Sequence, residues 1–333
     1  MNDSRQGKLI SVESRRRSPI TLAGRGARLL ALLGIGALGV LTVAASGMAA
    51  EPTGQDELDR AVVQEMLGQE GTPEVEPSAA DEKTQTNVER ASDDGRWAFG
   101  TAVILAPEKK GAYPEGRLFV AEKTGEEWKV SLDGSSMFAE MAGEAPTAVM
   151  SEGEKETFAP TSDYTVQAVN TKLQLPWKRG TSWRMAGGPH GWSTGYDRPY
   201  SALDFAGGKG RVRAAGGGKV YTMCGNNKGW IRVYHTNGYA TDYYHLRKNI
   251  KPRDGKKIKA GAFLGYTGTD VSCGGGAHGR HVHFALLRGD QHIAVDDKTI
   301  GGWTFHQGKA YKGYATHKGV KRYPGDRLRN FGR

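Results

Sequence analysis

The chain has 333 residues and a net charge of +10, and this charge is distributed unevenly. Residues 51 to 168 hold 10 basic and 25 acidic side chains, a net of −15, whereas residues 169 to 333 hold 29 basic and nine acidic ones, a net of +20. No glutamate follows Glu156, and glycine is dense in the C-terminal half. This composition excludes a mainly helical domain there and favours short strands and turns.

Residues 1 to 50 have the pattern of an export signal. They contain seven basic and two acidic residues, and the apolar run LLALLGIGALGVLTVAA (29 to 45) precedes the small residues SGMAA. The run is short for a membrane span and interrupted by glycine, so we expect a cleaved signal peptide. The protein would then be secreted and extracellular, with no stable membrane anchor after cleavage. Paired arginines before the run leave the general and the twin-arginine export routes both open.

Residues 51 to 168 contain no histidine and no cysteine. Their first part is polar and is expected to be loosely ordered or helical only in part. From Trp97 the segments RWAFGTAVILAP, GRLFVAEKTG and EWKVSLDG alternate apolar and polar residues between turn signals, which predicts a small β-containing module. We interpret this acidic α+β stretch, which has no catalytic side chains, as a pro-region. A permanent N-terminal binding domain is the alternative.

Residues 169 to 333 are predicted to form one antiparallel β domain. The segment WIRVYHTNGYATDYYHL has the pattern of a hairpin, with its turn signal at Asn237 and Gly238. GGKVYTM and HVHFALL supply further strands, and this half shows no sustained 3.6-residue apolar period. The predicted fold class is therefore mainly β.

The chain has two cysteines, Cys224 and Cys273. An even number in an exported chain is consistent with one disulfide. Such a bridge would close a loop of about 50 residues and stabilise the fold by up to about 4 kcal/mol. Two free, buried thiols are the alternative.

All nine histidines lie after residue 189, and two of them, His281 and His283, flank Val282 in HVHFALL. Because side chains alternate along a strand, both imidazoles point to one face. His190 and, 14 positions later, Asp204 lie among glycines and aromatic residues. Zinc in a catalytic site takes three nitrogen or oxygen ligands and keeps one position open, which a His, an Asp and a His can satisfy.

Each of these residues also has an ordinary explanation when it is taken alone. The two histidines can face water from a half-exposed strand, and a lone aspartate before phenylalanine is often a turn or cap residue. The spacing of 14 positions between His190 and Asp204 also differs from that of a helical HExxH site. A metal site would therefore have to be assembled from separate strands and loops.

The chain from about residue 173 to 333 resembles the lysostaphin-type zinc metalloendopeptidases, and most closely their staphylolysin and β-lytic branch. The resemblance is carried, in chain order, by LQLPWKRGTSW, GGPHGWSTG with SALDFA, TDYYHL, and CGGGAHGRHVHF. It implies an antiparallel β-sheet peptidase domain with one zinc ion, bound by His190, Asp204 and His283. His245 and His281 would be the catalytic residues, with His281 taking a proton from water and His245 hydrogen-bonding the oxyanion.

The resemblance also implies a disulfide between Cys224 and Cys273, and it places Tyr244 and Tyr311 near the bound substrate. The sequence departs from the branch at two places. Arg280 stands where a proline is usual, and no cysteine follows Cys273 to form a second bridge. Arg280 would change the substrate preference, or lower the basicity of the neighbouring histidine through its charge.

The activity implied by the resemblance is hydrolysis of glycine-rich or D-Ala-linked peptides in bacterial peptidoglycan. The opposite charges of the two parts of the chain predict a latent precursor that its own pro-region inhibits, and the protein is expected to be a monomer. A domain of charge +20 would concentrate on a polyanionic wall. The sequence contains no known basic-aromatic motif for nucleic acid, and none is expected as a partner. Two alternatives stay open: a non-catalytic wall-binding or regulatory protein of this fold, and a secreted protease for glycine-rich proteins. The complete set of five site residues favours an enzyme.

Overall fold

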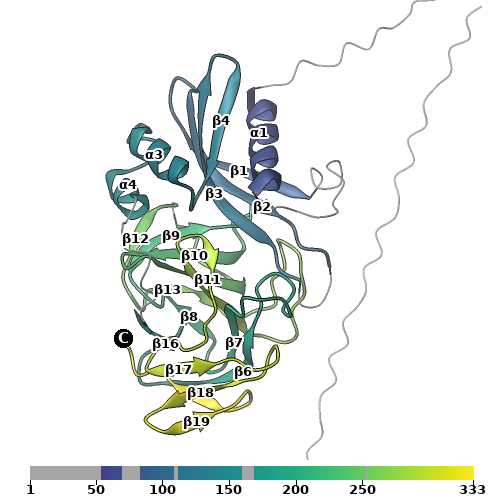
Figure 1. Ribbon diagram of the computed structural model, residues 1–333, viewed down its shortest axis with the longest axis vertical. Helices are drawn as coiled ribbons and strands as arrows, with labels where there is room; N and C mark the ends of the chain where they lie inside the picture. The colour runs from purple at the N-terminus through teal and green to yellow at the C-terminus, as the bar shows by residue number, and fades with distance from the viewer. Residues whose placement is uncertain (1–53, 70–82, 109–111, 160–168, 253) are drawn as a thin grey trace, which may run out of the picture. The chain divides into compact units, whose positions relative to one another are not determined.

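The computed structural model describes residues 54–69, 83–108, 112–159, 169–252 and 254–333 (Figure 1). The export signal predicted for residues 1 to 50 lies outside the described residues. Within the described ranges, no helix is both long enough and apolar enough to cross a membrane.

The described part of the acidic module is a four-stranded antiparallel meander with three helices. Its strands pair in chain order and are β1 (Thr84–Ala91), β2 (Trp97–Ile104), β3 (Glu115–Thr124) and β4 (Glu127–Leu132). Helix α1 (Gly54–Gln69) lies beside this sheet in Figure 1, and it packs Leu58, Val62 and Met66, one helical turn apart, onto the sheet. Helices α3 (Ser136–Glu144) and α4 (Glu152–Phe158) follow the meander. The β-containing module predicted from Trp97 is confirmed, and β1 extends it toward the N-terminus.

The basic part of the chain is built around one large antiparallel sheet. Its strand order is β12 (Lys256–Ile258), β9 (Gly218–Thr222), β10 (Gly229–His235), β11 (Tyr239–Leu246), β14 (Val282–Arg288), β7 (Ala202–Ala206), β6 (Ser182–His190) and β20 (Arg327–Arg329), with β15 (Gln291–His292) paired to β14. The predicted hairpin is confirmed, because β10 and β11 pair Tyr234 with Ala240 around a turn. Gly238 in that turn has a φ of 76°, which glycine adopts without strain.

Two smaller sheets complete this part. One pairs β8 (Arg211–Arg213) with β13 (Phe263–Tyr266), and the other has the order β19 (Val320–Arg322), β18 (Tyr314–His317), β17 (Trp303–His306), β16 (Thr299–Ile300) and β5 (Asn170–Leu173). The β16 and β5 strands pair in parallel, which departs from the purely antiparallel prediction. All regular elements described from residue 169 onward are strands, so the mainly β fold class is confirmed.

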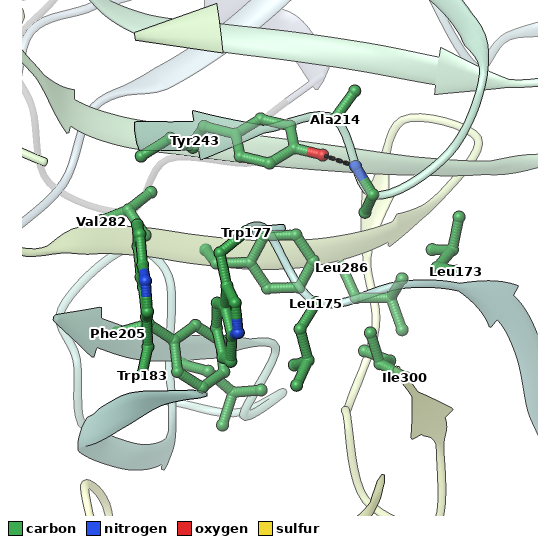
Figure 2. Packing of buried hydrophobic residues seen from close by; sticks show 14 of the residues in the cluster. Leu173, Leu175, Trp177, Trp183, Phe205, Ala214, Tyr243, Val282, Leu286 and Ile300 are labelled. Atoms are coloured by element: carbon green, nitrogen blue, oxygen red, sulfur yellow. Dashed lines mark hydrogen bonds between the residues drawn. The ribbon is translucent and has the colours of Figure 1, made fainter. Parts of the chain in front are cut away.

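One face of the large sheet packs on an aromatic and aliphatic core. Alternation along β14 directs Phe284 and Leu286 to this face. Figure 2 shows this cluster, in which the indole of Trp177 stacks on that of Trp183 with ring centroids 5.1 Å apart. The hydroxyl of Tyr243 lies above the cluster and accepts a hydrogen bond of 2.7 Å from the backbone N–H of Ala215.

The opposite face of the large sheet packs against the acidic module. Tyr244, Ala285 and Leu287 share a buried cluster with Phe99 and Phe138 of that module. Because both faces are covered, all eight residues of β11 are buried. The two parts of the chain therefore share a hydrophobic core.

Buried polar contacts also join the two parts. The guanidinium of Arg232 donates two hydrogen bonds to Asp242, of 2.8 and 2.9 Å, and a third of 3.0 Å to the carbonyl of Gly116 in β3. Tyr234 donates to Asp133 of the acidic module, and Tyr221 donates to Glu154 at 3.0 Å. These groups are buried, so each would lose a required partner if the parts separated.

The predicted disulfide is present between Cys224 and Cys273, with Cα atoms 5.8 Å apart. It ties the turn after β9 to the loop that leads into β14. Since Cys273 is nine residues before Val282, the bridge restrains the loop that leads into β14, the strand that carries His283.

Candidate metal and catalytic site

Three neighbouring strands bring the candidate ligands together. His190 ends β6, Asp204 lies in β7, and His283 lies in β14 directly opposite Asp204 in the register of the two strands. Gly187 of β6 pairs with Asp204 from the other side. The pairing of the strands therefore converts residues 93 positions apart in the chain into neighbours.

The ligand atoms converge at distances suited to a metal. His190 Nε2 lies 3.2 Å from His283 Nδ1, which lies 3.0 Å from Asp204 Oδ1. The remaining separation, from His190 Nε2 to Asp204 Oδ1, is 3.7 Å. Ligands bound tetrahedrally to zinc at its usual bond lengths lie about 3.4 Å from one another. The three residues thus fit one zinc ion.

Hydrogen bonds and burial set the protonation states that a metal needs. His190 Nδ1 donates to the carbonyl of Gly188 at 2.7 Å, which leaves the Nε2 lone pair available. Burial lowers the pKa of His190, and it lowers that of His283 to about 4. Burial opposes ionisation of Asp204, but the neighbouring histidines outweigh it and hold its pKa well below the usual range. Two neutral imidazoles and a carboxylate at neutral pH are the ligand forms that bind zinc.

His245 and His281 lie beside the candidate ligands. His281 Nδ1 donates to the carbonyl of Gly279 at 3.0 Å, and its Nε2 lies 3.5 Å from Asp204 Oδ1. His245, near the end of β11, donates from Nδ1 to the carbonyl of Asp270 at 2.9 Å. The two rings have centroids 4.8 Å apart. Each histidine is therefore oriented by a backbone carbonyl, with Nε2 left as the free nitrogen.

The electrostatic surroundings keep His245 neutral. Its Nε2 is buried and has no hydrogen-bond partner among the described residues. Burial, and then the charges of His281 and His283, lower its pKa to about 3. With Nδ1 carrying the single proton of the neutral ring, Nε2 is an acceptor.

The two predicted substrate tyrosines occupy different surroundings. Tyr311 stacks on the ring of His190, with centroids 4.0 Å apart, and lines a cleft beside the ligands. Tyr244 is buried, and its hydroxyl donates to the carbonyl of Gly274 at 2.7 Å. Tyr244 thus positions the glycine-rich loop before β14, and its contact with substrate stays a prediction.

Tyr113 of the acidic module also lies at the site, although nothing in the sequence predicts it. Its ring stacks on His283, with centroids 3.9 Å apart and planes 10° from parallel. Its backbone N–H donates to the carbonyl of Ser193, and the indole of Trp192 donates to the carbonyl of Pro114, both at 2.8 Å. A tyrosine before a proline carries no recognisable signal, so only the fold reveals this contact.

The remaining histidines are divided between structural and surface roles. His235 bonds Thr241 in the core, and His292 lies 3.2 Å from Asp242. His306 pairs with Asp297 at the surface, and His317 Nδ1 donates a hydrogen bond to the carbonyl of Gly302. His278 lines the cleft.

Residues 198–295 match the model of peptidase family M23. The chain belongs to this family. The matched segment contains Asp204, His245, His281 and His283, whereas His190 precedes it by eight residues. The M23 match therefore covers the part of the sheet in which the site is assembled.

Similar proteins include Protease LasA of Pseudomonas aeruginosa, 30% identical over 147 residues, which are 41% of this chain and 34% of LasA. Beta-lytic metalloendopeptidase of Lysobacter enzymogenes is 29% identical over 147 residues, 40% of this chain and 79% of that protein. The solved structure of a novel M23 metalloprotease, pseudoalterin from the deep sea, has 30% identity, covers 47% of this chain and 97% of its own, and gives a TM-score of 0.42. The chain spans about a third of the length of LasA.

Proposed function

We propose that the protein is a secreted zinc metalloendopeptidase that hydrolyses peptide bonds in bacterial peptidoglycan and is made as a latent precursor. The observation that carries the proposal is the convergence of His190, Asp204 and His283 beside two further histidines. The proposed organisation is a signal peptide (1–50), a pro-region (51–168) and a peptidase domain (169–333), acting as a monomer.

Zinc, when bound, would polarise the scissile carbonyl and lower the pKa of a bound water toward about 7. The chain's own residues would then handle the protons. His281 is the proposed general base, because the Gly279 carbonyl fixes its proton on Nδ1 and leaves Nε2 free to receive another.

The proposed role of His245 follows from its tautomer. Hydrogen-bonding an oxyanion from Nε2 would require a second proton on a ring whose pKa is lowered to about 3. We therefore replace the oxyanion role expected from the family resemblance by that of an acceptor. In this role Nε2 of His245 accepts a hydrogen bond from the attacking water and orients it, while His281 takes the proton.

The contact of Tyr113 supports latency. Its ring covers one face of the candidate ligand His283, and the backbone on both sides of Tyr113 is bonded to the strand connection at Trp192 and Ser193. A substrate peptide that approaches the ligands would meet this ring. The pro-region is thus proposed to inhibit the site directly and not only through its acidic charge.

The substrate class is supported by the relatives and by charge. Two similar proteins, Protease LasA and beta-lytic metalloendopeptidase, are named as peptidases. A net charge of +20 on residues 169 to 333 favours accumulation on a polyanionic wall. Glycine-rich or D-Ala-linked wall peptides are the proposed substrates.

The test is mass spectrometry of fragments released from purified peptidoglycan by the processed protein, with and without a chelator. Release of peptide fragments that stops on chelation and returns with zinc is the expected result. Binding to the wall without fragments would favour a non-catalytic wall-binding protein. Cleavage of glycine-rich proteins but not of peptidoglycan would favour the alternative of a secreted protease for glycine-rich proteins.

A further inference from the structure

The cleft beside the candidate ligands has a cationic lining. Arg184, Arg280 and Lys312 line it together with the aromatic rings of Tyr196 and Tyr311. Among the described lining residues Asp204 is the one carboxylate, and it belongs to the candidate metal site. The cleft therefore offers fixed positive charge without a neighbouring acid to neutralise it.

The three cations are not engaged elsewhere in the described structure. Buried arginines of this protein have carboxylate partners, as Arg232 has in Asp242, and the exposed Arg198 donates to Gln307 at 2.8 Å. No hydrogen bond or ion pair to a described residue involves the side chains of Arg184, Arg280 or Lys312, all of which are exposed. Their charged groups are available to a ligand.

The sheet register fixes the distance of Arg184 from the ligands. Arg184 in β6 pairs with Ala206 in β7, and paired residues share a face of the sheet. Ala206 is two positions after Asp204, so it lies on the same face, about 7 Å farther along the strand. Arg280 directly precedes His281. Arg184 thus lies about two residues of extended peptide from the candidate metal, and Arg280 lines the same cleft beside His281.

We propose that this cleft selects peptides that carry a free carboxylate within about two residues of the scissile bond, with Arg184 and Arg280 as the specificity-determining residues. This inference rests on the proposed peptidase function and names the substrate class of that site. An arginine can hold a carboxylate through paired N–H donors, which lysine cannot do. Lys312, which also lines the cleft, contributes further positive charge.

The test compares capped peptides of four glycines flanked by one glutamate, at either end, with the corresponding glutamine peptides. Binding is measured by calorimetry at 0.15 M salt on the zinc-loaded full-length chain carrying Y113A and H245A, which opens the cleft and slows turnover. We expect at least one glutamate peptide to bind about five- to thirtyfold more tightly than its glutamine partner.

R184Q with R280Q should remove this difference. K256Q with K257Q, on exposed residues of β12, removes the same charge and should leave the difference unchanged. Equal affinities for glutamate and glutamine, binding of neither peptide, or an unchanged preference in the arginine variant would each overturn the proposal.

Cleavage by the full-length Y113A chain is measured in parallel. If no peptide is cut but the glutamate preference in binding persists, the proposed activity fails and the carboxylate selectivity stands. If both peptides are cut with the same kcat/KM and bound equally, the activity stands and the selectivity fails.

Discussion

The phenol ring of Tyr113 lies parallel to the imidazole of His283 at a centroid distance of 3.9 Å. One residue comes from the acidic module and the other from the M23 region, 170 positions later in the chain. The contact joins the part of the chain without histidines to the candidate metal site.

Removing the Tyr113 ring should relieve latency. We expect the full-length Tyr113→Ala chain to cleave peptidoglycan peptides on the order of tenfold or more faster than the wild-type chain, because the lost stacking and burial no longer hold the segment over His283. Tyr113→Phe keeps the stacked ring and should stay latent. Equal rates for all three full-length chains would show that Tyr113 does not inhibit.

Ligand and catalytic variants should separate by metal content. His190→Ala, Asp204→Ala and His283→Ala should lower zinc occupancy as well as activity, because each removes a ligand. His281→Ala should retain most of the zinc and lose on the order of 10²-fold in rate. Metal analysis of the purified variants measures this. His306→Ala, from a second His and Asp group near the surface, is the control that should keep its zinc. Full zinc occupancy in His283→Ala would contradict the assignment.

The tautomer of His245 makes its role testable by substitution. Glutamine carries both an amide donor and a carbonyl acceptor, whereas arginine carries donors alone. We expect His245→Gln to recover part of the rate, on the order of 10²-fold, that His245→Ala loses, and His245→Arg to recover none of it, while all three variants keep zinc. Single-turnover rates on a glycine peptide are the measurement, made on chains that also carry Tyr113→Ala. A large recovery of rate by arginine would restore the oxyanion role.

A cut between Ala159 and Val169 should not release the acidic module. The parts share a buried aromatic cluster and the hydrogen bonds from Arg232 and Tyr234, which salt screens little. We expect the two fragments to elute together in size-exclusion chromatography at both 0.15 M and 1 M salt. Gly116→Val is the control variant whose fragments should separate, because a Cβ on Gly116 would lie 2.7 Å from the ring of Trp230. If the two fragments of the wild-type sequence separate at 1 M salt, surface charge holds the parts together.

Asp254 should make stability depend on pH. Burial, and then the charge of Glu89, raise its pKa to about 7. A carboxyl with a raised pKa binds its proton more tightly in the folded state, so its stabilising contribution is complete below about pH 4 and is lost as the pH rises toward 7. We expect the wild-type chain to lose about 2 to 4 kcal/mol relative to Asp254→Asn over this range. Urea unfolding at pH 4.5 and 7.5 tests this, and parallel pH curves would contradict it.

The sequence was sufficient to predict the hairpin around Gly238, the mainly β class and the residues that converge in the site. Turn chemistry and strand alternation are local, and the motifs around His190, Asp204 and His283 follow those of a known family. Tyr113 could not be predicted, because its contact depends on how a separate meander packs on the sheet. The tautomer of His245 was equally inaccessible, since the carbonyl of Asp270 that fixes it comes from a distant loop.

The acidic module covers the face of the large sheet that carries Trp230 and Tyr234, and this cover affects how the chain folds during synthesis. The meander precedes the sheet in the chain, so it leaves the ribosome first. When Trp230, Tyr234 and Leu287 follow, the surface that receives them already exists, and these side chains need not meet solvent or another chain. A domain produced from residue 169 alone would lack that partner and would be prone to aggregate during refolding.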